Sequence, residues 1–136
     1  MSTKTGLIGE YITAAAILEQ DGWQVSMAQQ DDTDLVAWKD GVFMRVQVKA
    51  STLRSQAAGR APGYHFQTGS GGKKRIKRGS YDIYALCAAT DRRVWFQAQC
   101  CINQLSLRKA RGFFADPHLE SDSWERAVQI VMECRK

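Results

Sequence analysis

The sequence predicts an α/β domain in which a mixed β-sheet is flanked by helices. The first reason is the order of its periodic segments: a helical pattern opens the chain, several strand patterns follow, and a second helical pattern closes it. The second reason is size, because 136 residues, 44% of them hydrophobic, suit one compact domain with a real core. We therefore expect a single domain over residues 1–136.

The first element is a helix over about residues 6–20. Apolar residues recur there at helical spacing, and Gly22 follows as a stop signal. The spacing predicts that one face packs on the core, consisting of Leu7, Tyr11, Ala14, Ala15 and Leu18.

A meander of three strands follows, over about residues 23–29, 33–38 and 42–51. Asp40-Gly41 separates the last two strands and is a strong signal for a two-residue hairpin. Alternation in the third strand predicts one face made of Val42, Met44, Val46 and Val48 and an opposite face made of Phe43, Arg45, Gln47 and Lys49.

The rest of the chain predicts further strands and a closing helix. We expect a short strand at 64–68 and two strands at 81–89 and 93–99, with a turn at Asp91-Arg92. Residues 103–112 have weak helical character. The closing helix is expected over 123–134, with Asp122 or Ser123 as its cap and an apolar side of Trp124, Val128, Val131 and Met132.

The basic excess is concentrated in one glycine-rich loop. The formal net charge is +5, and residues 51–80 contain seven Lys and Arg residues but no Asp or Glu. Within this loop, a basic run between glycines predicts an arm that follows a phosphate backbone: Lys73, Lys74, Arg75, Lys77 and Arg78. The alternatives are a solvated loop without a ligand and a localisation signal.

The cysteine and histidine pattern excludes several classes of protein. Four cysteines without a CxxC pair and two histidines cannot form a zinc finger or ribbon. Both histidines, His65 and His118, suit structural or surface roles better than catalysis. Adjacent Cys100-Cys101 suggests reduced thiols rather than a disulfide framework. We find no signal-peptide pattern and no apolar run near bilayer length, so we expect a cytoplasmic protein, associated with the nucleoid when it is bound to DNA.

Four polar residues form a candidate catalytic constellation. Gln47 and Lys49 share a strand face, and the Asp40-Gly41 hairpin can bring Asp34 beside them. Glu10 could reach the same point if the first helix packs on that face. Individually each has an ordinary structural explanation, such as a first-turn acid favoured by the helix dipole for Glu10; the joint order is what suggests a site.

Such a cluster suits metal-dependent phosphodiester hydrolysis. Mg²⁺, for which Mn²⁺ may substitute, prefers a few hard oxygen ligands and keeps several waters. Asp34 would be the direct carboxylate ligand, with the Gln47 side-chain oxygen and the Val48 carbonyl as further ligands. Lys49 would hold or help deprotonate the attacking water, and Glu10 would orient a water at the metal.

The same residues carry a resemblance to a known family. The segments are Gly6-Leu7-Ile8-Gly9-Glu10, Ala14-Ala15-Ala16, Gly22-Trp23, Asp34-Leu35-Val36 and Val46-Gln47-Val48-Lys49. They resemble the PD-(D/E)xK nuclease superfamily, most closely archaeal Holliday-junction resolvases and group I intron homing endonucleases. The resemblance covers about residues 5–51, and Tyr81-Asp82-Ile83-Tyr84 looks like the family's next core strand.

The resemblance implies a restriction-endonuclease-like core with Glu10, Asp34 and Lys49 as the motif residues. Two positions depart from the pattern: Gln47 replaces the usual acid two before the lysine, and Thr33 replaces the usual proline. Gln47 removes one negative charge from the metal pocket, as in some active homing-type branches.

We therefore expect a metal-dependent DNA endonuclease, structure-selective like a junction resolvase. The alternatives are a sequence-specific homing-type enzyme, a nuclease-like module that binds nucleic acid without cutting it, and an RNA-directed version of the nuclease or of the binding module. Because two strands must be cut in a fixed relation, we also expect a homodimer or homotetramer. Candidate interface residues are Trp95, Phe96, Phe113, Phe114 and Trp124, although core packing suits each of them better.

Overall fold

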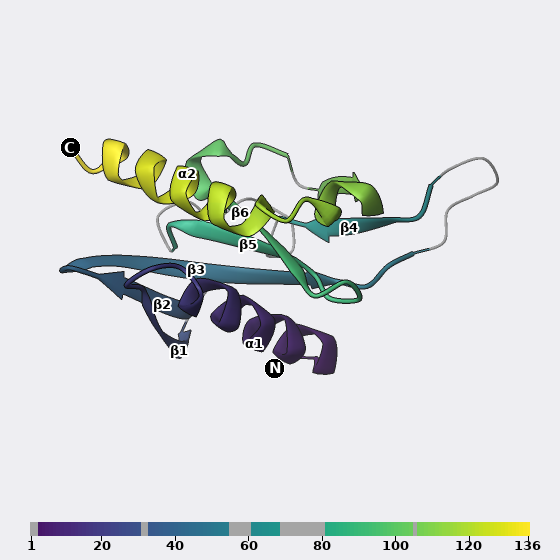
Figure 1. Ribbon diagram of the computed structural model, residues 1–136, viewed down its shortest axis with the longest axis horizontal. Coiled ribbons are helices and arrows are strands. Elements are labelled where there is room, and N and C mark those ends of the chain that lie inside the picture. Colours follow the sequence, from purple (N-terminus) through teal and green to yellow (C-terminus); the bar gives the residue numbers. More distant parts are fainter. Residues whose placement is uncertain (1–2, 31–32, 55–60, 69–80, 105) are drawn as a thin grey trace.

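The computed structural model describes the chain except for residues 1–2, 31–32, 55–60, 69–80 and 105. The described parts contain two α-helices, seven strands and two short 3₁₀ helices (Figure 1). Their bounds, in chain order, are α1 (Lys4–Leu18), β1 (Gln24–Gln30), β2 (Thr33–Lys39), β3 (Val42–Ser51), β4 (Gly63–Gln67), β5 (Ile83–Ala88), β6 (Arg93–Ala98), η1 (Gln99–Cys101), β7 (Ser106–Ala110), η2 (Arg111–Ala115) and α2 (Leu119–Cys134).

The main sheet is mixed, as the sequence predicts. Its strand order is β1-β2-β3-β5-β6; β3 and β5 are parallel, and the other neighbours are antiparallel. The hairpin between β2 and β3 is confirmed at Asp40 and Gly41, whose φ angles of 50° and 80° match a turn that needs two left-handed residues. A second, two-stranded sheet pairs β4 with β7.

The predicted alternation of β3 is also confirmed. Met44 and Val46 are buried, whereas Phe43 and Arg45 are exposed. Met44 and Val46 belong to a core cluster that also contains Ile17 of α1. The opposite face of the sheet forms a second cluster with β4 and η2, so the small sheet covers the side away from α1.

α1 packs through a different face from the one predicted. Its buried residues are Gly9, Glu10, Thr13, Ala16 and Ile17. Two members of the expected apolar face, Tyr11 and Leu18, are instead 61% and 52% exposed. α1 is apolar on nearly every side, so periodicity alone cannot select the packed face.

α2 begins four residues earlier than expected. Its N-cap is His118, so Asp122 and Ser123 lie inside the helix rather than capping it. The Ser123 hydroxyl instead accepts a hydrogen bond from the Phe96 backbone N–H at 3.0 Å. The Glu120 carboxylate likewise accepts from the Val94 N–H at 3.1 Å. α2 therefore packs on the edge strand β6 and also accepts hydrogen bonds from two of its backbone N–H groups.

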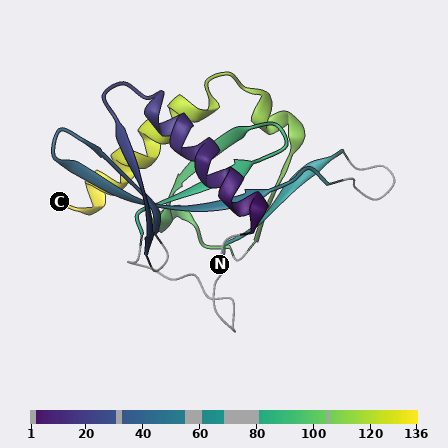
Figure 2. The same ribbon diagram turned by 90° about the horizontal axis from the view of Figure 1, so that it is seen from below.

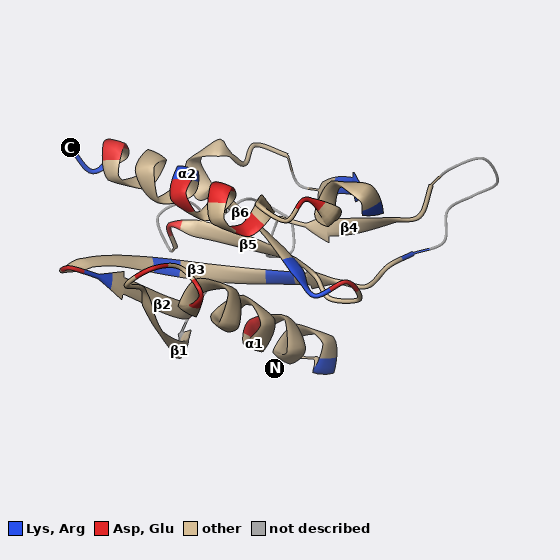
Figure 3. Cartoon of the chain, viewed as in Figure 1, with Lys and Arg blue, Asp and Glu red and all other residues tan. Residues whose placement is uncertain are grey.

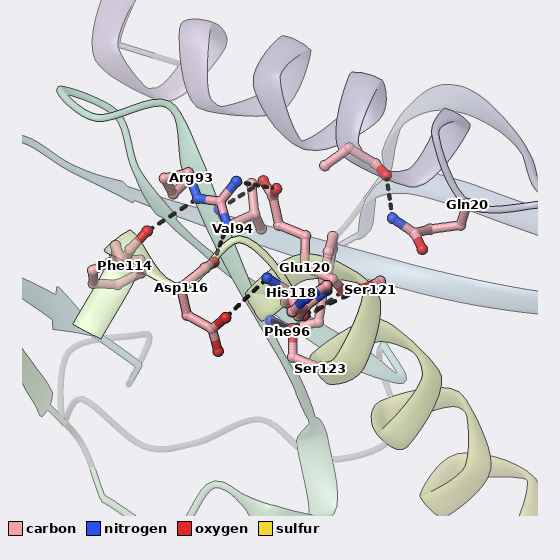
Figure 4. A network of polar contacts seen from close by, with 11 residues as sticks. Gln20, Arg93, Val94, Phe96, Phe114, Asp116, His118, Glu120, Ser121 and Ser123 are labelled. Carbon is pink, nitrogen blue, oxygen red and sulfur yellow. Dashed lines mark hydrogen bonds and ion pairs between the residues drawn. The ribbon is translucent and has the colours of Figure 1, made fainter. Parts of the chain in front are cut away.

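Arg93 completes this connection at the N-terminal end of α2 (Figure 4). Its guanidinium forms an ion pair of 2.9 Å with Glu120 and donates to the carbonyls of Phe114 and Asp116. One arginine therefore joins the start of β6, η2 and the first turn of α2, where acidic side chains are favoured by the helix dipole.

One further expectation is corrected. The weakly helical segment contains strand β7, because its residues pair with β4, for example Arg108 with His65. Core packing, the better explanation for the late aromatic residues, is confirmed for three of them, since Phe96, Phe114 and Trp124 are buried.

Basic and acidic residues are both distributed along the described chain, and acidic residues recur along α2 (Figure 3). The predicted basic arm, Lys73, Lys74, Arg75, Lys77 and Arg78, lies outside the described residues. Among the helices that the structure describes, none is long and apolar enough to cross a membrane.

Candidate active site at the end of the central strand

Asp34 and β3 meet where β2 begins. Asp34 directly precedes Leu35, which pairs with Val46 in the β2–β3 ladder. The Asp34 carboxylate accepts a hydrogen bond of 2.8 Å from the backbone N–H of Val48. The predicted proximity of Asp34 to the middle of β3 is therefore present in the structure.

This hydrogen bond also fixes the direction of the Val48 carbonyl. In an extended strand the N–H and C=O of one residue point to the same side. Because the Val48 N–H points to the side of β3 that carries Asp34, its carbonyl oxygen points to the same side. The Arg45 carbonyl, an odd number of residues away, points the opposite way and accepts from the Asp82 N–H beside β5 at 2.8 Å. Asp34 and the Val48 carbonyl thus offer oxygens on one side of β3.

Gln47 and Lys49 lie on the sheet face opposite α1. They pair with Tyr84 and Leu86 of β5, which belong to the second core cluster. Gln47 is only 9% exposed, and Lys49 is partly buried. Both side chains project from the same face, as alternation predicts.

Glu10 occupies a different layer from the other three candidates. α1 packs on the Val48 and Ala50 side of β3, since a Cβ added at Gly9 would lie 2.6 Å from the Ala50 Cβ. The condition for Glu10 to join Gln47 and Lys49, helix packing on their face, is therefore not met. Gly9 nevertheless lets α1 pack closely against the C-terminal half of β3, and the helix lies across the sheet in Figure 2.

Glu10 is 4% exposed, and its carboxylate is bound by a residue that the sequence patterns do not indicate. Gln29 donates from Nε2 to Glu10 Oε1 at 2.6 Å. Gln29 has a φ of 56° and lies in the irregular part of β1, where the register with β2 shifts. A β-bulge re-aims a side chain in a way that alternation in the sequence cannot reveal.

The donor set fits a hard divalent cation that keeps most of its waters. Asp34 supplies a carboxylate, Gln47 an amide oxygen, and Val48 a carbonyl on the Asp34 side of β3, whereas Glu10 lies in the layer of α1. No group of three or more His, Cys, Asp or Glu side chains placed to hold a metal occurs in the described part of the chain. Oxygen ligands of this kind suit Mg²⁺ or Mn²⁺ and do not suit a structural zinc site.

Lys49 also lines a hollow of about 450 Å³ at the end of β3. Arg54 and His65 line the same hollow. The sequence suggests only a structural or surface role for His65, and nothing in the spacing of these three residues indicates that they converge. The pairing of β4 with the segment after β3 brings them together.

Comparisons with known proteins bear on the family and the fold. A family model described as PD-(D/E)XK endonuclease matches residues 1–110. A bacterial homing endonuclease of known structure is similar in fold, with a TM-score of 0.67 and 19% sequence identity; the match covers 99% of this chain and 98% of that one. A search of curated proteins found no match. The expected resemblance and the restriction-endonuclease-like core are thus confirmed: the chain belongs to the PD-(D/E)XK endonuclease family.

Proposed function

We propose that this protein is a Mg²⁺-dependent endodeoxyribonuclease that hydrolyses phosphodiester bonds in DNA. The observation that carries the proposal is the meeting of Asp34 with the backbone of Val48, in a strand that also bears Gln47 and Lys49. Family membership supports the reaction class. Mn²⁺ is expected to substitute for Mg²⁺, because both accept hard oxygen ligands.

Each residue has a separate task in this proposal. Asp34, assisted by Gln47 and the Val48 carbonyl, holds the cation, which supplies Lewis-acid stabilisation of the phosphoryl oxygens when it is bound. The Lys49 ammonium holds or helps deprotonate the attacking water and balances the phosphate charge. Glu10 orients a second water from the α1 side, and Gln29 fixes the carboxylate of Glu10 through the 2.6 Å hydrogen bond.

Substitution of Gln47 tests whether the metal pocket requires a neutral side chain at this position. We expect Gln47→Glu to be tolerated or to tighten Mg²⁺ binding, since it adds a carboxylate oxygen beside Asp34. Metal titration followed by cleavage rates measures this effect. Complete loss of cleavage would show that the neutral amide is required.

Two kinds of target are consistent with this site. Sequence-specific cutting, as in homing endonucleases, is favoured by a structural likeness to one such enzyme that extends over nearly the whole of both chains. Structure-selective cutting, as in junction resolvases, is favoured by the basic arm at residues 73–78, because contacts to phosphates carry no base sequence. A panel of junctions, duplexes, flaps and single strands distinguishes the two.

We propose that the enzyme acts as a homodimer or homotetramer with its basic surfaces turned towards DNA. Four of the exposed large apolar side chains lie on α1, namely Leu7, Ile8, Tyr11 and Leu18, and they offer a surface for association. Light scattering at micromolar concentration should then give at least twice the chain mass of 15.3 kDa. A strict monomer, free and on DNA, would exclude paired cutting.

The basic arm has its own test in this proposal. Neutralising Lys73, Lys74, Arg75, Lys77 and Arg78 together should weaken binding to all DNA sequences alike. The slope of log affinity against log salt should flatten by roughly 0.9 for each duplex phosphate that the arm no longer neutralises. An unchanged slope would exclude the arm as a phosphate-binding element.

The decisive experiment compares Asp34→Ala and Lys49→Ala with matched changes far from the site. Single-turnover cleavage in Mg²⁺ or Mn²⁺, with EDTA as the metal-free reference, should fall by about 10²–10⁴-fold in both variants, while DNA affinity and the fold persist. Asp21→Ala and Arg126→Ala remove the same charges from exposed positions and should cut normally. Wild-type cleavage by either site variant would disprove the assignment, and binding without cleavage by the wild type would indicate a binding module.

A further inference from the structure

We propose that the hollow at the end of β3 binds a second backbone phosphate of the DNA strand, next to the phosphate that lies at Lys49. The site would be formed by Arg54 and His65 together with Lys49. This inference rests on the proposed nuclease function, because it is the role of Lys49 in cleavage that makes the neighbouring phosphate part of the substrate. It assigns DNA contacts to described residues that are separate from the basic arm.

Backbone hydrogen bonds hold the walls of the hollow together. Arg54 and Gly63 form an antiparallel bridge, with N···O distances of 3.0 and 3.3 Å. The His65 backbone N–H donates to the Ser51 hydroxyl at 3.3 Å. The end of β3 and the beginning of β4 are therefore fixed to each other, so the backbone positions from which these side chains extend are set before a ligand binds.

Strand alternation directs the polar side chains of β4 into the hollow. Tyr64 and Phe66 are buried in the second core cluster, so His65 and Gln67 project to the other side. Lys49 enters from β3, and Thr5 enters from the first turn of α1. Ammonium, guanidinium, imidazole, amide and hydroxyl groups are all donors that phosphate oxygens accept.

The described charged residues that line the hollow are all basic. Its described lining contains Lys49 and Arg54 but no Asp or Glu. Arg108 pairs with His65 across the small sheet, and its exposed side chain adds a positive charge to this sheet. Cations in a concave site raise the local concentration of an anion, and this favours a phosphate over a neutral ligand.

The size and position of the hollow favour a nucleic-acid strand over a free anion. A volume of about 450 Å³ exceeds what a single phosphate needs and is within the range of sites that hold a nucleotide. Lys49 is shared between the hollow and the candidate active site. A strand whose scissile phosphate lies at Lys49 would therefore place an adjacent phosphate against Arg54 and His65.

The test uses thymidine 3′,5′-bisphosphate, which carries two phosphates on one nucleoside, and follows its binding to the full chain by two-dimensional NMR. We expect shifts of the Thr5, Lys49, Arg54 and His65 resonances. Arg54→Ala and His65→Ala should each weaken binding by roughly 10-fold, the reduction typical of removing a hydrogen bond to a charged group. The same spectra show whether each variant is folded, and His65→Gln provides a conservative second variant.

Matched controls are available for both side chains. His118 is the other histidine of the sequence and is exposed, and Arg126 is exposed on α2. His118→Ala and Arg126→Ala should bind the bisphosphate like the wild type. Equal affinity of all four alanine variants, or shifts confined to other parts of the protein, would overturn the proposal.

Cleavage assays separate this inference from the proposed function. In an active nuclease, removal of the Arg54 or His65 side chain should raise KM for DNA about 10-fold and change single-turnover cleavage at saturating DNA much less. A wild-type protein that binds the bisphosphate in the hollow but cuts no DNA would disprove the nuclease and retain the phosphate site. A protein that cuts DNA while both variants keep wild-type KM would disprove the phosphate site alone.

Discussion

Substitution of Gly9 by alanine tests the packing on which the candidate site depends. An alanine Cβ at this position would lie 2.6 Å from the Ala50 Cβ, about 1 Å inside the usual carbon–carbon contact distance. Ala50 follows Lys49 on β3, and Gly9 precedes Glu10 on α1. A bulkier residue at position 9 therefore has to push α1 and its acidic residue away from β3.

Two opposing effects determine the sign of the stability change. Alanine in place of glycine inside a helix stabilises it by about 1 kcal/mol. Forcing a methyl group into a packed contact costs about 1–3 kcal/mol. With the close approach to a strand Cβ, we expect the second effect to prevail and the net destabilisation to reach up to about 2 kcal/mol.

Urea unfolding followed by circular dichroism measures this change in the free energy of unfolding. The double variant Gly9→Ala/Ala50→Gly removes the opposing Cβ, so it should be more stable than Gly9→Ala alone despite the cost of glycine in a strand. A Gly9→Ala protein about 1 kcal/mol more stable than the wild type would refute the reasoning. In that case helix propensity alone would determine the stability change, and α1 would not pack against Ala50 at position 9.

Two further predictions concern charge and thiol chemistry. Asp82 is partly buried, which opposes its ionisation, but hydrogen bonds and charge from Arg45 and charge from Arg135 outweigh burial and lower its pKa. Asp82→Asn should therefore reduce stability by about 1–3 kcal/mol at pH 7. The difference from the wild type should vanish in urea titrations as the pH falls through the lowered pKa. Burial raises the pKa of Cys87 to about 12, so an alkylating reagent should label it only after unfolding.

The sequence predicts the strands of the meander better than the packing of the first helix. Asp40-Gly41 is a local signal that acts through backbone conformation, and the register on both sides of it follows. α1 is apolar on most sides, and its packed face is determined by the small residues Gly9 and Ala16 that allow close approach to the sheet. Such a contact depends on the partner strand, so no periodic pattern in the helix sequence indicates it.

The candidate site likewise contains contacts that local sequence predicts and contacts that it does not. The proximity of Asp34 to β3 follows from a hairpin of known register, so it is predictable from local sequence. The Gln29 contact to Glu10 depends on a bulge, and the convergence of His65 with Lys49 depends on how β4 folds back after β3. These tertiary arrangements are outside the reach of alternation and turn signals.

The parallel pairing of β3 with β5 has a consequence for the order in which the protein folds. β1, β2 and β3 are joined by connections of two residues each, whereas the first β3–β5 pair joins Val46 to Ile83, 37 positions later in the sequence, with β4 between them. Closing a longer loop costs more chain entropy, and non-local pairing is slow. We expect the meander to form first and β5 to dock later. The Asp34 contact to Val48 would then exist in an early intermediate, while the walls around His65 would be assembled only near the end of folding.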